Sequence, residues 1–140
     1  MKNLPNQFFY SKEEDRLNVI SHGIGFILSI IGLIFLLNKG LQDFNLLRFL
    51  SFLIYGISLS TMYIASTLYH NSKTPEGRYK FRLFDMVSIY LLIAGSYTPF
   101  TLTVLIDSGG LTLFSLVWAI AFIGIMWKVF TVGNYNISST

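Results

Sequence analysis

Long apolar stretches alternate with short polar ones along the whole chain. Each apolar stretch approaches the roughly 20 residues that a helix needs to cross a bilayer core. None alternates polar and apolar positions as a membrane β-strand does, and backbone groups in lipid must be satisfied within the segment. The pattern therefore predicts an all-α, polytopic transmembrane helix bundle, with spans at about residues 19–37, 46–69, 86–105 and 111–130.

The segments outside these spans are polar. Residues 1–18 lack the apolar core of a cleavable signal peptide, so the first span is expected to stay as a membrane anchor. Residues 131–140 are expected to form a polar tail. Pro99 should kink or end the third helix, and the run from Asp107 to Gly110 should form a turn between antiparallel helices.

Composition agrees with a membrane location. The 140 residues are 53% hydrophobic and 12% charged, whereas an ordinary soluble domain carries roughly 25% charged residues. The ten Lys and Arg residues lie singly or in small groups, which argues against a nucleic-acid partner. The absence of Cys excludes disulfides and thiolate ligands.

The positive charges are distributed unevenly between the two sides of the predicted bundle. Eight of the ten Lys and Arg residues flank the N-terminus, the loop after the second span or the end of the fourth span. Positively charged flanks favour the cytoplasmic side. We therefore expect a multi-pass protein of the cell membrane with a cytoplasmic N-terminus.

Polar side chains within the spans recur at helical spacing. The second span carries Ser60, Tyr63, Ser66, Thr67 and His70 on one stripe, and the first carries Asn18, His22, Gly25, Ser29 and Gly32. Asp85 is expected to open the third helix at the depth of His70. Ionisable groups in membranes usually face the bundle interior, so these residues predict a polar site near the inner interface.

Two interpretations of this polar group remain open. Interfacial His, Asp and Ser side chains often bind only head groups or water, and Asp85 would complement a helix dipole. Alternatively, imidazole and carboxylate without thiolate suit a zinc ion, which takes three protein ligands plus water at catalytic sites. With only His22 and His70 in the chain, one copy cannot supply three histidines.

The sequence resembles the bacterial haemolysin III family, the prokaryotic branch of the progestin and adipoQ receptors. The resemblance runs from about Glu13 to Phe130. It is carried by the segments Ser21 to Gly25, Ser66 to His70, Phe81 to Asp85 and Ile89 to Phe100.

The resemblance implies seven membrane helices and a zinc ion near the cytoplasmic side. It also implies membership of a wider group associated with metal-dependent hydrolysis of lipid amides. His70 maps to a zinc ligand, and Ser66 and Asp85 map to residues that support the metal and its water. His22 maps to a His-Gly-x-Gly motif without a ligand role.

Two departures from the family pattern stand out. Met86 replaces a His that follows the Asp in many relatives. The two remaining zinc ligands of the family, a His-x-x-x-His pair on the seventh helix, have no counterpart before Thr140. The chain is therefore expected to be truncated, with four of seven helices, and to need a complementing C-terminal half or a second copy.

Three functions stay open from the sequence. The first is a zinc-dependent hydrolase, or a receptor-like scaffold, with a lipid substrate or ligand. The second is a pore-forming cytolysin with Ser60, Tyr63, Ser66 and His70 as pore lining. The third is an inserted but inactive product.

Overall fold

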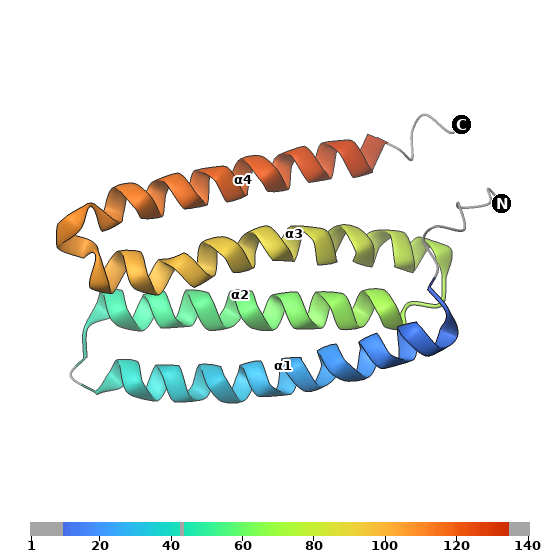
Figure 1. Ribbon diagram of the computed structural model, residues 1–140, viewed down its shortest axis with the longest axis horizontal. Coiled ribbons are helices and arrows are strands. Elements are labelled where there is room, and N and C mark those ends of the chain that lie inside the picture. Colours follow the sequence, from blue (N-terminus) through green and yellow to red (C-terminus); the bar gives the residue numbers. More distant parts are fainter. Residues whose placement is uncertain (1–9, 43, 135–140) are drawn as a thin grey trace.

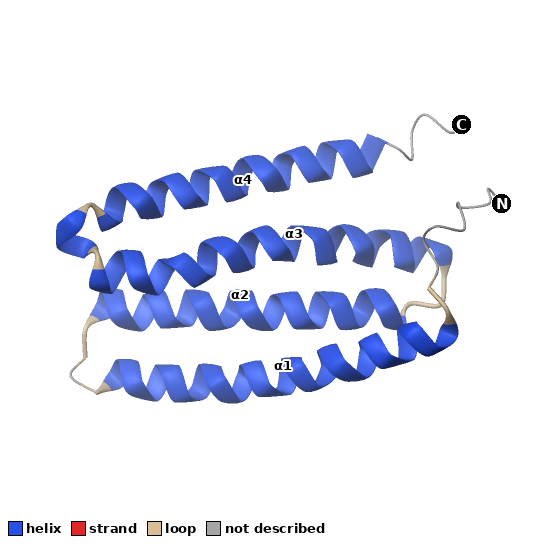
Figure 2. Ribbon diagram, in the orientation of Figure 1, coloured by secondary structure: helices blue, strands red, loops and turns tan. Residues whose placement is uncertain are grey.

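The computed structural model describes residues 10–42 and 44–134. Four long helices follow one another in it (Figure 1): α1 (Lys12–Leu41), α2 (Leu46–Asn71), α3 (Pro75–Pro99) and α4 (Gly110–Asn134). A π-helical segment (Phe100–Val104) and a 3-10 turn (Ile106–Ser108) join α3 to α4. The described part contains no strand (Figure 2). The all-α prediction is confirmed, and each helix contains an apolar stretch long enough to cross a membrane.

Side-chain caps explain why two of the helices begin well before their apolar stretches. Ser11 accepts a hydrogen bond from the backbone of Glu14, whose carboxylate accepts one from the backbone of Ser11. This capping box starts α1. Thr74 accepts a hydrogen bond from the backbone of Gly77, and Pro75 occupies the first helical turn, where its missing N–H costs nothing.

The sequence-based expectation about the start of the third helix is wrong. Asp85 does not open the third helix, because α3 already begins at Pro75 and places Asp85 nearly three turns further on. Charged residues mark where the hydrocarbon core ends, but a helix can continue past that point into water. The helix α4 likewise continues to Asn134, past residue 130, where the predicted membrane span ends. The rest of the predicted polar tail, residues 135–140, lies outside the described residues.

The connection between α3 and α4 follows its prediction. The α-helix ends at Pro99, which cannot donate a backbone hydrogen bond. Gly109 then adopts a positive φ of 87°, a conformation that costs little only for glycine. The turn reverses the chain, and Trp118 on α4 donates a 3.1 Å hydrogen bond back to Thr98 on α3.

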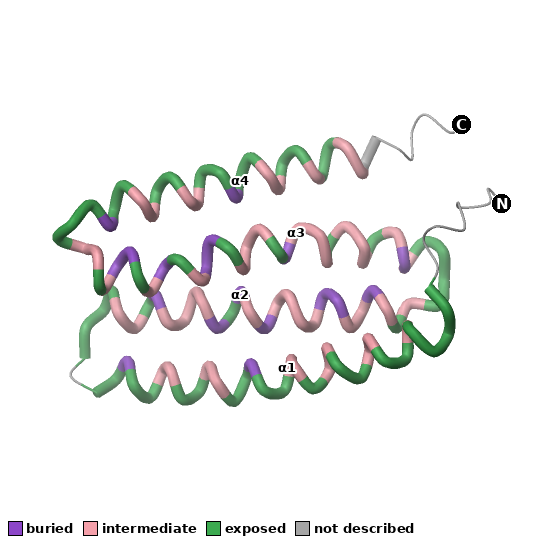
Figure 3. Tube along the Cα trace, viewed as in Figure 1, coloured by how far each residue is buried: buried purple, intermediate pink, exposed green. Residues whose placement is uncertain are grey.

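The four helices lie in a row (Figure 1). α1 packs against α2, α2 against α3 and α3 against α4, and within the described residues α1 packs against neither α3 nor α4. Buried positions are accordingly concentrated on α2 and α3, whereas α1 and α4 expose most of their apolar side chains (Figure 3). These outer faces are suited to contact with lipid chains.

The buried residues between α2 and α3 are small and often polar. Ser51, Ser88, Thr98 and Thr101 are fully buried. Their hydroxyl groups donate to carbonyls of their own helix, as Ser88 does to Asp85 and Thr98 to Ala94. Such local bonds use the hydrogen of each hydroxyl within its own helix, and small side chains let membrane helices approach closely.

The predicted close packing of the first helix is found at two of its positions. A Cβ added at Gly25 would stand 2.4 Å from the Tyr63 ring, and the hydroxyls of Ser29 and Ser60 lie 2.9 Å apart. Gly32 differs, since nothing lies within 4 Å of an added Cβ there.

Close packing of α2 against α3 predicts a measurable cost for a methyl group at Gly95. The new Cβ would stand 2.8 Å from the Cβ of Ser58, which cannot move without its helix. We expect Gly95→Ala to destabilise the protein by roughly 1–3 kcal/mol, as overpacking does. Thermal unfolding in detergent, followed by circular dichroism, measures the change.

Gly23→Ala is the matched control, because nothing lies within 4 Å of its added Cβ. Alanine favours helix over glycine by about 1 kcal/mol, so Gly23→Ala should unfold at the same or a higher temperature. Equal unfolding temperatures for the two variants would contradict the close α2–α3 packing.

Candidate functional site

Three helices meet at one end of the row. The start of α1, the end of α2 and the start of α3 lie together there, and the C-terminal end of α4 points the same way (Figure 1). We call this region the polar end and define it by Asp15, His22, His70, Arg78 and Asp85. Antiparallel packing places early residues of α1 opposite late residues of α2, which explains how residues distant in sequence meet.

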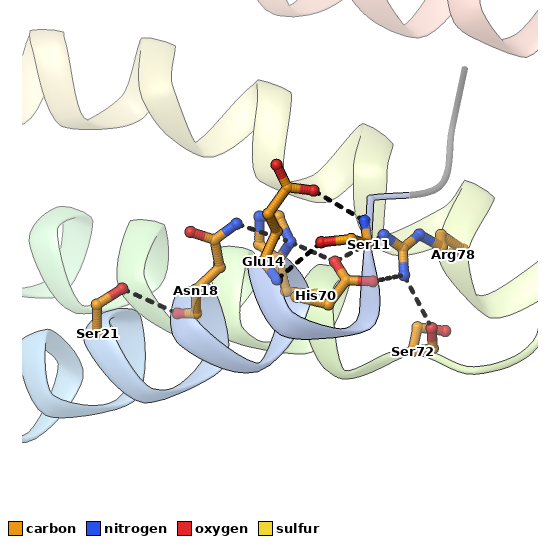
Figure 4. Close-up of polar contacts among 8 residues, drawn as sticks. Ser11, Glu14, Asn18, Ser21, His70, Ser72 and Arg78 are labelled. Carbon is orange, nitrogen blue, oxygen red and sulfur yellow. Dashed lines mark hydrogen bonds and ion pairs between the residues drawn. The ribbon is translucent and has the colours of Figure 1, made fainter. Parts of the chain in front are cut away.

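Asp15 connects the three helices at the polar end. Its Oδ1 lies 2.9 Å from Nδ1 of His70 on α2. The guanidinium of Arg78 on α3 donates to both carboxylate oxygens, from Nη1 to Oδ2 at 2.7 Å and from Nη2 to Oδ1 at 2.8 Å (Figure 4). Two parallel bonds of this kind are among the stronger charge-assisted contacts in proteins.

Arg78 is buried and is held from several sides. Its side chain is 5% exposed, its Nη1 also donates to the backbone carbonyl of Ser72, and its guanidinium carbon lies 5.1 Å from the centre of the Tyr69 ring. A buried cation needs such partners to offset the loss of water. The ion pair joins α1 to α3, which do not otherwise pack together.

The environment of Asp15 favours its ionised form. Burial alone would raise the pKa of Asp15, but hydrogen bonds from Arg78 and His70, with the positive charge of Arg78, outweigh it and lower this pKa below its ordinary value. Asp15 precedes the apolar stretch of α1, which begins at about residue 19. Its carboxylate is therefore a fixed negative charge at neutral pH.

His70 lies among aromatic rings. Its side chain is 9% exposed, and its ring centre is 4.8 Å from that of Tyr69 and 5.3 Å from that of Tyr10. The His22 ring is parallel to it, with planes 3° apart and centres 6.1 Å apart. Nδ2 of Asn18 lies 3.5 Å from Nδ1 of His70, at the limit of a hydrogen bond.

Ser66 and Asp85 lie one turn deeper than His70. Ser66 is buried on α2. Asp85, half-buried on α3, lies close enough to Ser66, His70 and His22 for these side chains to act on its carboxyl group. The structure thus brings together the four residues that the sequence places at one depth. The catalytic roles of Ser66 and Asp85 and the zinc role of His70 stay predictions.

The described residues of the polar end offer fewer groups than a metal ion usually needs. Within residues 10–42 and 44–134, no three His, Asp or Glu side chains are grouped so as to hold a metal ion. His70 presents a ring whose Nδ1 is occupied by a carboxylate, an arrangement typical of zinc-binding histidines. The described residues therefore fit one zinc ligand and its orienting partner, but not the usual three ligands.

Sequence reasoning missed Asp15 and Arg78 as site residues. Asp15 precedes Asn18 and His22 at steps of three and four, so it extends the polar stripe of the first helix by one turn. That spacing was a usable signal. Arg78 carries no local signal, because only folding brings it to a partner 63 positions away.

An apolar groove borders the polar end. It lies between α1 and α2, has a volume of about 450 Å³ and is lined by residues that include Leu28, Leu33, Leu36, Tyr55, Leu59 and Tyr63. The Tyr63 ring is 6.1 Å from the ring of His22. Tyr63 therefore links the groove to the cluster of ionisable groups.

These features define an all-α membrane protein with ionisable groups gathered at one end of its helices. The chain belongs to the haemolysin III family, since the sequence model described as "Haemolysin-III related" matches residues 10–140. It is 40% identical over 128 residues to Hemolysin-3 of Bacillus cereus, and 37% identical over 131 residues to the Hemolysin-3 homolog of Bacillus subtilis (strain 168).

The matches cover most of this chain but less of its relatives. They include 91% and 94% of this chain, and 58% and 62% of the B. cereus and B. subtilis proteins respectively. No solved structure matches the chain.

The ion pair at the polar end predicts a strong effect of removing Arg78. Arg78→Ala leaves the Asp15 carboxylate without its main partner, and breaking a buried pair in this way costs about 3 kcal/mol or more. We expect a clearly lower unfolding temperature in detergent, measured by circular dichroism.

Lys80→Ala serves as the control for Arg78→Ala, because Lys80 is an exposed cation on the same helix. Its unfolding temperature should stay close to that of the unaltered protein. An equally small effect of Arg78→Ala would show that the ion pair does not hold α1 to α3.

Proposed function

We propose that this chain forms part of a zinc-dependent membrane hydrolase that acts on a lipid amide, with His70 as a zinc ligand. The observation that carries the proposal is the convergence of His22, Ser66, His70 and Asp85 at one end of three apolar helices. Ionisable groups are costly in a membrane and mark functional sites by default.

The chemistry of these residues suits hydrolysis. A zinc ion bound there would supply a water molecule with a pKa near neutrality. In this proposal Asp85 accepts a proton from the attacking water as a general base. In this proposal Ser66, which lies close to Asp85, donates a hydrogen bond that holds the carboxyl group of Asp85 in place.

The remaining ligands are proposed to come from outside the described residues. A catalytic zinc generally takes three protein ligands, of which this chain offers His70. The chain spans about three fifths of the length of the two Bacillus relatives. A complementing C-terminal half, or a second copy of the chain, would complete the site.

The proposed substrate class follows from the surroundings of the polar end. The groove along α1 and α2 is apolar and is suited to an acyl chain. Tyr63 lies between the groove and His22, so a lipid lying in the groove would carry its polar head to the ionisable groups. We also propose that the polar end faces the cytoplasm, because most of the Lys and Arg residues flank it.

A chimeric protein tests the hydrolase proposal. This chain, joined to the part of Bacillus cereus Hemolysin-3 that follows the matched region, is purified in nanodiscs. We expect it to retain zinc and to cleave a fluorescent ceramide-type amide. His70→Ala should weaken zinc binding by at least 100-fold, because it removes a direct ligand, and Asp85→Asn should abolish cleavage while zinc is retained. Metal analysis and fluorescence measure the two effects.

Lys39→Ala is the control, since Lys39 lies at the opposite end of α1 and should leave both properties unchanged. A chimera that retains no zinc, or whose zinc content is the same with and without His70→Ala, would overturn the metal proposal. Zinc binding without cleavage of any amide would indicate the receptor-like scaffold instead.

The name hemolysin, which both Bacillus relatives carry, favours a second candidate, a pore-forming cytolysin. The structure gives the proposed pore lining little access to water: Ser60 and Ser66 are buried, and Ser60 is bonded to Ser29. We therefore expect no dye release from phospholipid vesicles that contain the purified chain over a broad range of protein concentrations. Release that rises steeply with protein concentration, and falls when Ser60 is replaced by Leu, would support the cytolysin.

A further inference from the structure

The contacts of His70 determine which of its ring nitrogens carries the proton. Nδ1 lies 2.9 Å from Oδ1 of Asp15, and an ionised carboxylate only accepts hydrogen bonds. Nδ1 must therefore be the N–H donor. The amide nitrogen of Asn18 lies 3.5 Å from the same Nδ1. An amide nitrogen only donates hydrogen bonds, so it cannot bond to an Nδ1 that already carries hydrogen. The contact with Asp15 is the shorter of the two, so it determines the position of the proton.

Arg78 fixes the carboxylate that His70 contacts. Its two nitrogens hold both oxygens of Asp15, so the plane of the carboxylate cannot rotate freely. Arg78 is in turn held by the carbonyl of Ser72 and by the Tyr69 ring. Ser72 and Tyr69 lie within two residues of His70 in the sequence. The contacts that run from His70 through Asp15 to Arg78 therefore return to the end of α2 that carries His70.

The first turn of α1 determines where Asp15 stands. The capping box of Ser11 and Glu14 fixes the start of the helix immediately before Asp15. A shift by one residue would rotate Asp15 by about 100° around the helix and remove it from both partners.

We propose that Asp15 and Arg78 are positioning residues that hold His70 in the Nδ1–H form and so keep its Nε2 free of hydrogen. The proposal depends on the proposed function in one respect, namely that the group bound by Nε2 of His70 is a zinc ion. A ring nitrogen without hydrogen is the form that coordinates a metal, and the hydrogen bond at the other nitrogen sets which one is free.

Nitrogen NMR of the ¹⁵N-histidine-labelled chain tests the assignment directly. The spectra are recorded in detergent at about pH 8.5, where an ordinary imidazole is neutral. His22→Gln leaves His70 as the single histidine signal. We expect the proton of His70 on Nδ1 in this background, and a shift to the Nε2–H form when Asp15→Leu removes the acceptor. A purely structural role of Asp15 would leave the ring form unchanged.

Glu13→Gln is the matched control, because Glu13 is an exposed carboxylate two positions before Asp15 and should leave the ring form unaltered. If His70 carries its proton on Nε2 while Asp15 is unaltered, that single spectrum overturns the proposal. So would an unchanged ring form in Asp15→Leu with the original helix content.

Zinc affinity separates this inference from the proposed function. In the zinc-binding chimera, Asp15→Leu should weaken zinc binding about 10–100-fold, as loss of an orienting partner does, and Glu13→Gln should not. If the chimera bound no zinc, the hydrolase proposal would fall, whereas the NMR result would still decide the role of Asp15. Undiminished zinc affinity in Asp15→Leu would overturn the positioning role.

Discussion

The ion pair between Asp15 and Arg78 is the interaction on which the arrangement of the polar end depends. The helices lie in a row, so α1 and α3 are separated by α2 and meet only where these two side chains reach across its last turn. The pair is stable there because both oxygens of the carboxylate are bonded and the guanidinium lies against an aromatic ring. It places a fixed negative charge beside His70, and the rest of the candidate site is arranged around that histidine.

The row is held together in its apolar part by close contact and not by large side chains. Hydrocarbon does not drive helices together as water does, so packing depends on small residues that allow close approach. Gly25, Gly95 and the buried serines provide this between α1, α2 and α3. Most of the serine hydroxyls donate within their own helix, whereas the ionisable side chains of different helices meet at the polar end.

Much of the candidate site could be predicted from the sequence, because His22, Ser66 and His70 lie on helical stripes of their own spans. The start of the third helix could not be predicted in this way, because charged residues mark the edge of an apolar stretch and not the end of a helix. Asp85 therefore lies within α3 and not at its start. The same error concealed Arg78, which the sequence presents as one more positive charge in a loop and the structure places on the first turn of α3.

The sequence by itself determined that the described part of this chain is all-α, with four apolar helices suited to a membrane, because hydropathy and backbone satisfaction depend on the order of residues alone. It also determined the family, through motifs that are continuous in the chain. Only the tertiary structure decided which charges meet. The pairing of Asp15 with Arg78 and His70 joins residues 55 to 63 positions apart, and no periodicity within one helix specifies a partner on another.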